Sequence, residues 1–168
     1  MPLRRLIFLA SLVLAVAAIS PSAALAAAHG TNRPLTGTAT GTTTLTFIAP
    51  GIAEATSGFT GHLSHLGSET GQDELTITAT SANTFTYAGT RTFVAANGDE
   101  VFSAITGSGT FTPTTAQSTE NDTITGGTGR FAGASGTYAD TVSFIVVSAT
   151  TTTETLRFNV ITEGQISY

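Results

Sequence analysis

The chain has 168 residues, enough for one domain, and its composition excludes several protein classes. It has no Cys, so a disulfide scaffold, a thiolate metal site and a cysteine nucleophile are ruled out. Only 10% of the residues are charged and acidic residues outnumber basic ones by 11 to 6, a balance that fits neither a helical bundle nor a nucleic-acid-binding protein. The 35 Thr and 18 Gly residues favour extended strands joined by turns.

The N-terminal segment 1–28 has the features of a secretory signal peptide. Two arginines near its start are followed by an uncharged apolar run of 14 residues. This run is shorter than the ~20 residues that a membrane-spanning helix needs. Two Ala-x-Ala sites predict cleavage after Ala26 or Ala28. We therefore expect a secreted or otherwise extracytoplasmic protein, with an uncleaved membrane anchor as the alternative.

Removal of this segment leaves a strongly acidic chain. It keeps four Arg against eleven acidic residues, a net charge of −7, and it has no Lys. We expect neither nucleic acid nor an anionic lipid surface as its partner. Its remaining apolar stretches are all shorter than 18 residues, so we expect no membrane span in the mature chain. Asn121 begins a glycosylation sequon, which has meaning only in a eukaryotic secretory pathway.

Beyond a flexible N-terminal segment at 29–35, residues 36–168 read as a single all-β domain. Alternation of apolar and polar residues with a period of two predicts strands at 40–49, 59–66, 74–80, 84–94, 100–111, 120–125, 129–138, 140–148 and 153–168. Asn97-Gly98 is a strong signal for a hairpin turn. A series of eight or nine short strands removes its exposed edges by closing into an antiparallel barrel. A two-sheet β-sandwich is the alternative that the pattern leaves open.

An arginine lies on the apolar face of one predicted strand. This face of the strand at 84–94 carries Phe85, Tyr87, Arg91 and Phe93. An inward arginine needs an acidic partner. We therefore expect Arg91 to pair with Asp99 or Asp140, which the same alternation places on the inner face. Two alternatives are a position at the barrel mouth with the guanidinium in solvent, and a bulge at Gly89 that reverses the parity.

The side chains that the alternation places on the inner face define a candidate ligand-binding lumen. Its predicted residues are His65, Phe85, Tyr87, Arg91, Phe93, Phe111, Phe144 and Phe158. We expect a hydrophobic small molecule there, with an anionic group oriented by Arg91. His65 is expected on the inner face as a buried core histidine or as a functional one. His62 and His65 point to opposite faces of a strand and no third ligand has a fitting spacing, so no metal site is expected.

A glycine-rich run covers residues 126–136. We predict a structural role for its glycines, as turn residues or as sites of bulging and close backbone approach. These glycines are Gly126, Gly127, Gly129, Gly133 and Gly136. A phosphate-binding loop is excluded, because more strand follows in place of a helix and the chain has no Lys.

This run, Gly-Gly-Thr-Gly-Arg-Phe-Ala-Gly-Ala-Ser-Gly, resembles the signature of the dirigent and allene oxide cyclase-like barrels. Exported bacterial proteins of this superfamily are similar over roughly residues 36–168, sharing a His-Leu-Gly element (65–67), an Ala-Asn-Gly-Asp hairpin (96–99) and a C-terminal Gly-x-Ile-Ser-Tyr (164–168). The resemblance implies an eight-stranded antiparallel β-barrel whose apolar cavity binds hydrophobic small molecules. It also implies that radical coupling or cyclisation is steered there without a metal or an organic cofactor.

The resemblance does not assign a catalytic residue. The catalytic carboxylates of the plant enzymes match no position of this chain, and no Ser-His-Asp arrangement is present. The alternative function is a non-catalytic secreted or envelope domain with a filled core, whose outer surface contacts a matrix or a partner.

Overall fold

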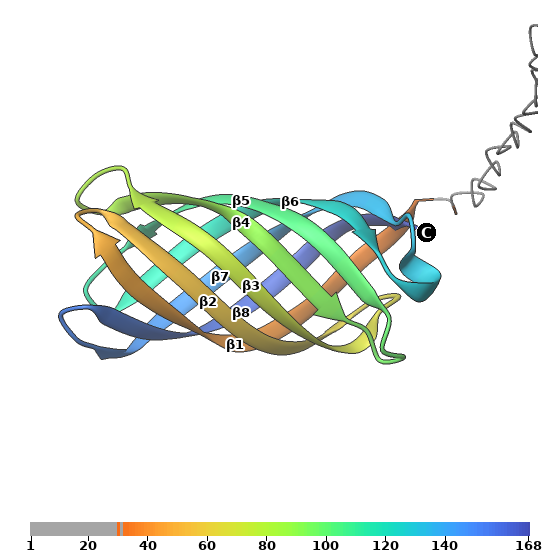
Figure 1. Ribbon diagram of the computed structural model, residues 1–168, viewed down its shortest axis with the longest axis horizontal. Coiled ribbons are helices and arrows are strands. Elements are labelled where there is room, and N and C mark those ends of the chain that lie inside the picture. Colours follow the sequence, from red (N-terminus) through yellow and green to blue (C-terminus); the bar gives the residue numbers. More distant parts are fainter. Residues whose placement is uncertain (1–29, 31) are drawn as a thin grey trace, which may run out of the picture.

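The computed structural model describes residue 30 and residues 32–168, which form a closed antiparallel β-barrel (Figure 1). The elements are β1 (Arg33–Ala49), β2 (Ile52–Leu63), β3 (Gly67–Ala79), β4 (Thr84–Val94), β5 (Glu100–Phe111), β6 (Thr115–Gly127), the short 3₁₀ helix η1 (Gly129–Phe131), β7 (Ser135–Ala149) and β8 (Thr153–Ser167). Each strand pairs with the next, and β8 pairs back onto β1. The predicted eight-stranded barrel is confirmed, and the sandwich alternative is wrong.

The predicted signal peptide at 1–28 lies outside the described residues. In the part of the chain that the structure does describe, no helix has both the length and the apolar character required to cross a membrane.

Four strands, β1, β2, β3 and β6, begin earlier than predicted; β3 begins at Gly67 in place of 74, and β6 at Thr115 in place of 120. β1 begins at Arg33, inside the segment 29–35 that was predicted to be flexible. The physical reason is Leu35, which is buried and pairs with Gly164 of β8. In β2, the inward residues Ala53, Ala55 and Ser57 are small, so the alternation there is too weak to show that the strand starts at Ile52.

The predicted pair of strands at 129–138 and 140–148 is one strand, β7, preceded by η1. Gly129 and Gly133 have φ values of +52° and +81°, a left-handed conformation that ends extended structure on both sides of η1. From Ser135 onward the ladder to β8 continues past Asp140 without a break. Asp140 therefore lies in the middle of a strand and points into the barrel.

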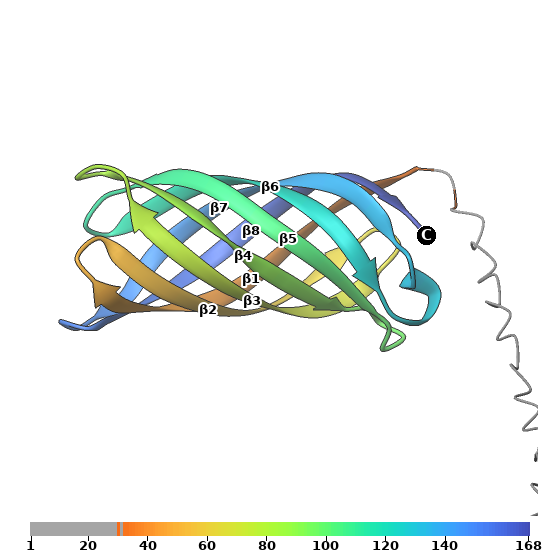
Figure 2. The same cartoon turned by 45° about the horizontal axis from the view of Figure 1, so that its top comes forward.

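The two ends of the barrel differ (Figures 1 and 2). The C-terminus and the β2–β3, β4–β5 and β6–β7 connections lie together at one end, and the other four connections lie at the opposite end. The end that carries the C-terminus is packed with apolar side chains, and we call it the closed end. The buried side chains there include Leu35, Leu63, Leu66, Val101, Phe131 and Ile166. We call the opposite end the open end.

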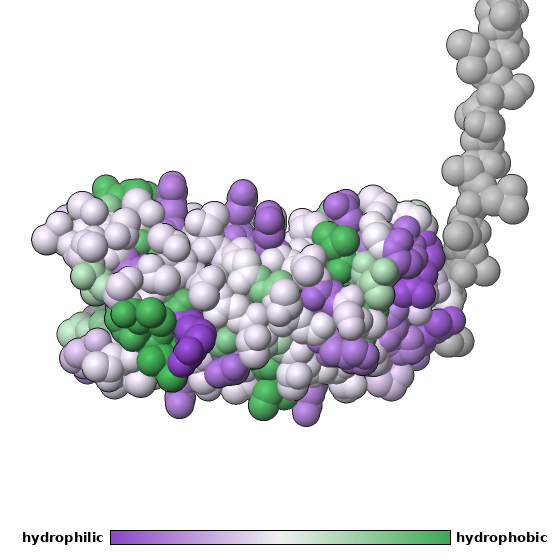
Figure 3. Space-filling view, turned by 90° about the horizontal axis from the view of Figure 1, so that it is seen from below, coloured by the Kyte–Doolittle hydropathy of each residue, from purple (hydrophilic) through white to green (hydrophobic). Residues whose placement is uncertain are grey.

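The outer surface is rich in Thr, and most of the face in Figure 3 is of intermediate hydropathy. The large apolar side chains that are exposed are Phe47, Ile48, Phe111, Ile145, Val147 and Ile161. All of these except Ile161 belong to the parts of β1, β5 and β7 next to the open end. The open end therefore has an apolar rim.

The glycine-rich run at 126–136 contacts the β2–β3 and β4–β5 connections at the closed end. Gly129 has a φ of +52°, and a Cβ atom there would press on the Asp99 carboxylate, so glycine is favoured beside the β4–β5 turn. The next residue, Arg130, donates its backbone N–H to Asp99 Oδ2 at 3.0 Å and its guanidinium N–H to the carbonyl oxygen of His65. These contacts join the run to the β2–β3 and β4–β5 connections, and the structural role of its glycines stays a prediction.

Candidate functional site

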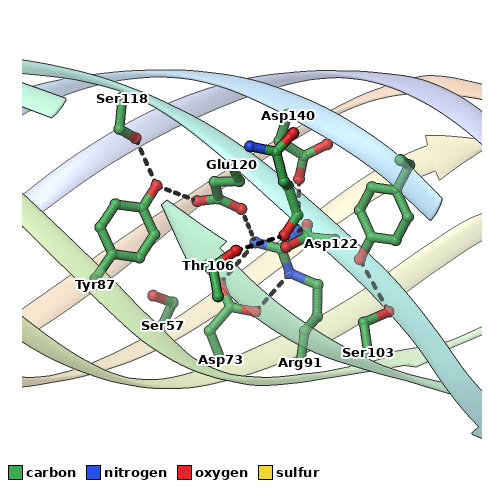
Figure 4. Close-up of polar contacts among 12 residues, drawn as sticks. Ser57, Asp73, Tyr87, Arg91, Ser103, Thr106, Ser118, Glu120, Asp122 and Asp140 are labelled. Carbon is green, nitrogen blue, oxygen red and sulfur yellow. Dashed lines mark hydrogen bonds and ion pairs between the residues drawn. The ribbon is translucent and has the colours of Figure 1, made fainter. Parts of the chain in front are cut away.

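A buried ionic cluster centred on Arg91 crosses the middle of the barrel (Figure 4). The Arg91 side chain is 4% exposed, and all three of its guanidinium nitrogens donate to carboxylates. Its Nε and Nη2 bind the two oxygens of Asp73 on β3, at 2.7 and 3.2 Å. Its Nη2 also binds Glu120 Oε2 at 2.9 Å. Its Nη1 binds Asp140 Oδ2 at 2.5 Å and Asp122 Oδ2 at 3.2 Å.

The sequence predicts only part of this cluster. The inward direction of Arg91 is as expected, and β4 pairs with β3 and β5 without a bulge at Gly89. A position at the barrel mouth in solvent is wrong, because the guanidinium is buried. Asp140 is a partner as expected, but Asp99 is not, because it lies in the β4–β5 turn and accepts hydrogen bonds from Asn97 and Arg130.

Three partners of Arg91 were not predicted: Asp73, Glu120 and Asp122. The alternation of side chains along a strand indicates only that Asp73 and its neighbour Glu74 point to opposite faces. The structure does place Asp73 inside the barrel and Glu74 outside. Glu120 and Asp122 alternate with outward Asn121 and Thr123, in step with the buried Ala116 and Ile124. The only signal for them in the sequence is their spacing from Ala116 and Ile124, because the inward residues between these two are as polar as their outward neighbours.

The cluster contains more acid than its single cation can compensate. Glu69, 4% exposed, is a fifth buried carboxyl group, and neither of its oxygens has a hydrogen-bond partner. Asp122 Oδ1 and Asp140 Oδ1 are also buried without a partner. Burial raises the pKa of Glu69 to about 8 and that of Asp122 to about 8, against the opposing effect of Arg91. Part of the cluster is therefore protonated at neutral pH.

One carboxylate oxygen from each of Glu120, Asp122 and Asp140 lies within 4.8 Å of the others, which is the spacing of a cation site. Each of these three residues, however, already accepts a hydrogen bond from Arg91. The guanidinium thus serves as the cation of this acidic group.

Two tyrosine hydroxyls extend the polar network along the barrel axis. The Tyr87 hydroxyl lies 2.8 Å from Ser118 Oγ and 2.9 Å from Glu120 Oε1. Since a phenol carries one proton, it donates to one of these oxygens at a time. Burial, together with the nearby Glu120 carboxylate, raises the pKa of Tyr87 well above its usual range. On the other side of Arg91, the Tyr138 hydroxyl donates to Ser103 Oγ at 3.0 Å.

A cavity of about 360 Å³ lies between this cluster and the open end. Its floor is formed by Asp73, Tyr87, Arg91 and Glu120, and its mouth includes Glu154. The wall is mostly apolar and includes Leu45, Ile77, Phe85, Phe111, Val142, Phe144, Leu156 and Phe158. This volume falls within the range of ~300–1,000 Å³ that is usual for small-molecule pockets. The arrangement is a cup with apolar walls and a charged, hydrogen-bonding floor.

Six of the eight predicted lumen residues line this cavity, namely Phe85, Tyr87, Arg91, Phe111, Phe144 and Phe158. Phe93 also points inward, but it lies on the far side of the cluster, where its ring packs against Phe59 at 5.6 Å. The eighth, His65, does not line the cavity and is not part of a strand. β2 ends at Leu63, and His65 lies in the following turn with a φ of +73° and its ring 6.1 Å from that of Tyr168.

Comparisons with known proteins give little beyond this geometry. No protein-family model matches the chain, and neither does any curated protein. Among solved structures, the chain is similar to the pterocarpan synthase dirigent protein GePTS1, with 14% sequence identity and a TM-score of 0.41. The similarity covers 82% of this chain and 86% of that chain. We base the function proposed below on the cavity itself.

Proposed function

We propose that this protein is an exported β-barrel that binds a hydrophobic small molecule in the cavity at its open end. The observation that carries the proposal is the 360 Å³ cup, whose wall is apolar and whose floor offers hydrogen-bonding groups. Apolar pockets of this size with a few polar groups at one end are typical of small-molecule sites. The signal-peptide features of residues 1–28 support the exported location.

The competing function is that of a non-catalytic secreted domain. It predicts a barrel whose core is filled with side chains and has no cavity. Only the closed end is filled in this way, with side chains such as Phe131 and Ile166. The open half has no such packing, which supports the binding function over this alternative.

A ligand titration tests the proposal. The probe is N-phenyl-1-naphthylamine, a neutral apolar fluorophore, and the expected result is saturable binding of one probe per barrel. Ala116→Trp places an indole in the cavity, because Ala116 is buried in its wall, and should weaken binding by about tenfold or more, the equivalent of ~1.4 kcal/mol. Ala104→Trp is the matched control, because Ala104 is exposed on the outer face of β5.

Thermal unfolding of each variant shows whether it is folded. If Ala116→Trp does not fold, the smaller change Ala55→Leu reduces the same cavity. Absence of saturable binding by the unaltered barrel, or equal binding by the cavity-filled and control variants, would overturn the proposal.

A dirigent- or cyclase-like activity is a second candidate, favoured by the position of Tyr87 and Glu120 at the end of an apolar wall. Here the cavity holds the substrate in one orientation, and the two groups fix its polar end. In the radical version two equivalents of an added one-electron oxidant each take one electron from a phenol, which also releases a proton to solvent, and the two resulting phenoxyl radicals join by one new bond. The expected result is an enantiomeric excess in the coupled product, and a racemic product with and without the barrel contradicts this activity.

A further inference from the structure

We propose that the cavity selects hydrophobic cations, such as long-chain amines, over hydrophobic carboxylic acids. This inference rests on the proposed binding function and names its ligand class. It is the opposite of what Arg91 alone suggests, since an isolated inward arginine favours an anionic ligand.

The first argument is that Arg91 has no free capacity for an anion. Each of its three guanidinium nitrogens already donates to a carboxylate, and four acidic residues share it. An incoming carboxylate must displace one of these groups and leave that group buried and unpaired. Unpaired buried charge is strongly unfavourable, so an anionic ligand is rejected.

The second argument is the charge of the cavity surface. Asp73 and Glu120 form part of its floor, Glu154 lies at its mouth, and Arg91 is the one cation among the described residues that line it. The other described arginines lie elsewhere. Arg33 and Arg130 pack on Tyr168 at the closed end, and Arg157 is on the outer face. A ligand ammonium group therefore meets Glu154, which has no ion pair among the described residues, and two floor carboxylates that share the single Arg91 charge with two further acids. The floor lies at a depth where charges interact more strongly than in water.

The third argument is the aromatic lining. The ring of Phe85 lies 5.9 Å from that of Tyr87 and 6.0 Å from that of Phe111, and Phe144 lies 5.7 Å from Phe158. Aromatic faces attract a cation within ~6 Å of the ring centre and offer nothing comparable to an anion. The same preference is visible below the floor, where the Arg91 guanidinium lies 5.4 Å from the ring of Phe59.

The proposal includes a pH dependence, because burial raises the pKa of Glu120 and of Glu154. The titratable and charged groups that face Glu120 are Tyr87, Arg91, Asp73, Asp122 and Asp140. Glu154 pairs with Leu45 and Ala149, neither of which titrates. An ammonium group favours the ionised form of these two acids, so its binding releases protons. Amine affinity should therefore rise as the pH rises through the raised pKa values of these two acids.

The test is displacement of N-phenyl-1-naphthylamine by decylamine, decanol and decanoic acid, which share one chain and differ in charge. We expect decylamine to bind about tenfold or more tightly than decanol, the equivalent of ~1.4 kcal/mol, and decanoic acid to bind more weakly than decanol. Only the amine should gain affinity as the pH is raised above 4.5, the ordinary pKa of a glutamate. Glu154→Gln and Glu120→Gln should each reduce the preference for the amine. Glu74→Gln, on the outer face of β3, should leave it unchanged.

The outcomes separate the two proposals. Saturable probe binding with decanoic acid displacing as well as decylamine overturns the cation preference and leaves the binding function standing. A preference for the amine that Glu154→Gln and Glu74→Gln reduce equally also overturns it, because that result assigns the effect to the general surface charge. Binding of neither the probe nor any decyl compound overturns the binding function itself.

Discussion

Asp73 and Arg91 face each other directly across β3 and β4, and the Arg91 guanidinium binds both carboxylate oxygens of Asp73, at 2.7 and 3.2 Å. Such a two-point contact between planar groups fixes the orientation of the guanidinium. In this orientation the other edge of the guanidinium reaches Glu120 on β6 and Asp140 on β7. The Asp73–Arg91 pair thus fixes the position of the guanidinium. The guanidinium in turn links β3, β4, β6 and β7 inside the barrel.

Arg91→Met should destabilise the fold without ligand by about 3–5 kcal/mol, because it leaves a group of buried carboxylates without their cation. Urea unfolding followed by circular dichroism gives the free energy of unfolding. Arg157→Met is the matched control and should change this value by less than about 0.5 kcal/mol, because Arg157 lies on the outer face. Equal stability of the two variants would show that protonation of the carboxyl groups compensates fully for the lost guanidinium.

The free energy of unfolding should fall as the pH rises from 5 to 8. The pKa of Glu69 is about 8 in the folded state and 4.5 by its ordinary value, so between these values the folded state binds the extra proton. The stability that this proton contributes is complete below pH 4.5 and is lost as the pH rises through 8. Asp122 behaves in the same way. Each group contributes at most ~1.4 kcal/mol per pH unit.

Urea midpoints at pH 5, 6, 7 and 8 measure this dependence. Glu69→Gln should flatten it, because an amide stays neutral at every pH. Glu163→Gln, on the outer face of β8, should leave the slope as it is. A Glu69→Gln variant with an unchanged slope would show that Glu69 is ionised in the folded state.

Gly133→Val should reduce the free energy of unfolding by about 1–3 kcal/mol, because Gly133 has a φ of +81° that a β-branched residue rarely adopts. Gly58→Val is the control. Gly58 is exposed in β2, a Cβ atom added there would have no neighbour within 4 Å, and Val favours strands. Equal unfolding midpoints for the two variants would contradict a structural role for Gly133.

The exported protein should begin at Ala27 or His29, which follow the two predicted cleavage sites. Intact-mass measurement of the protein recovered outside the producing cell identifies the first residue. A mature protein that retains Met1 would contradict the signal peptide and favour the membrane anchor.

The sequence pattern predicts the inner face of the barrel best where that face carries large side chains. Along β4, the alternation of Phe85, Tyr87 and Phe93 places Arg91 inside, and the same reasoning along β7 places Asp140 inside. Along β6 the inward Ser118, Glu120 and Asp122 are as polar as their outward neighbours, so hydrophobic alternation does not distinguish the two faces.

The ionic cluster also depends on which strands lie opposite each other. Asp73 reaches Arg91 through the register of β3 and β4, and Glu120 and Asp140 reach it across the interior of the closed barrel. The parity of a single strand contains no information about these distances. The hairpin signal at 96–99 does indicate that Asp99 lies in a turn, but parity could not show that this turn lies at the closed end, away from the Arg91 guanidinium.

The pairing of β1 with β8 joins the first and the last strands of the barrel. Before β8 emerges, the growing sheet has two unpaired edges, on β1 and on β7, and edges of this kind pair readily with other chains. Pairing between strands so distant in the sequence also makes folding slow. The nascent chain is therefore exposed to aggregation until its final fifteen-residue strand is complete, and any truncation that removes β8 leaves it in that state.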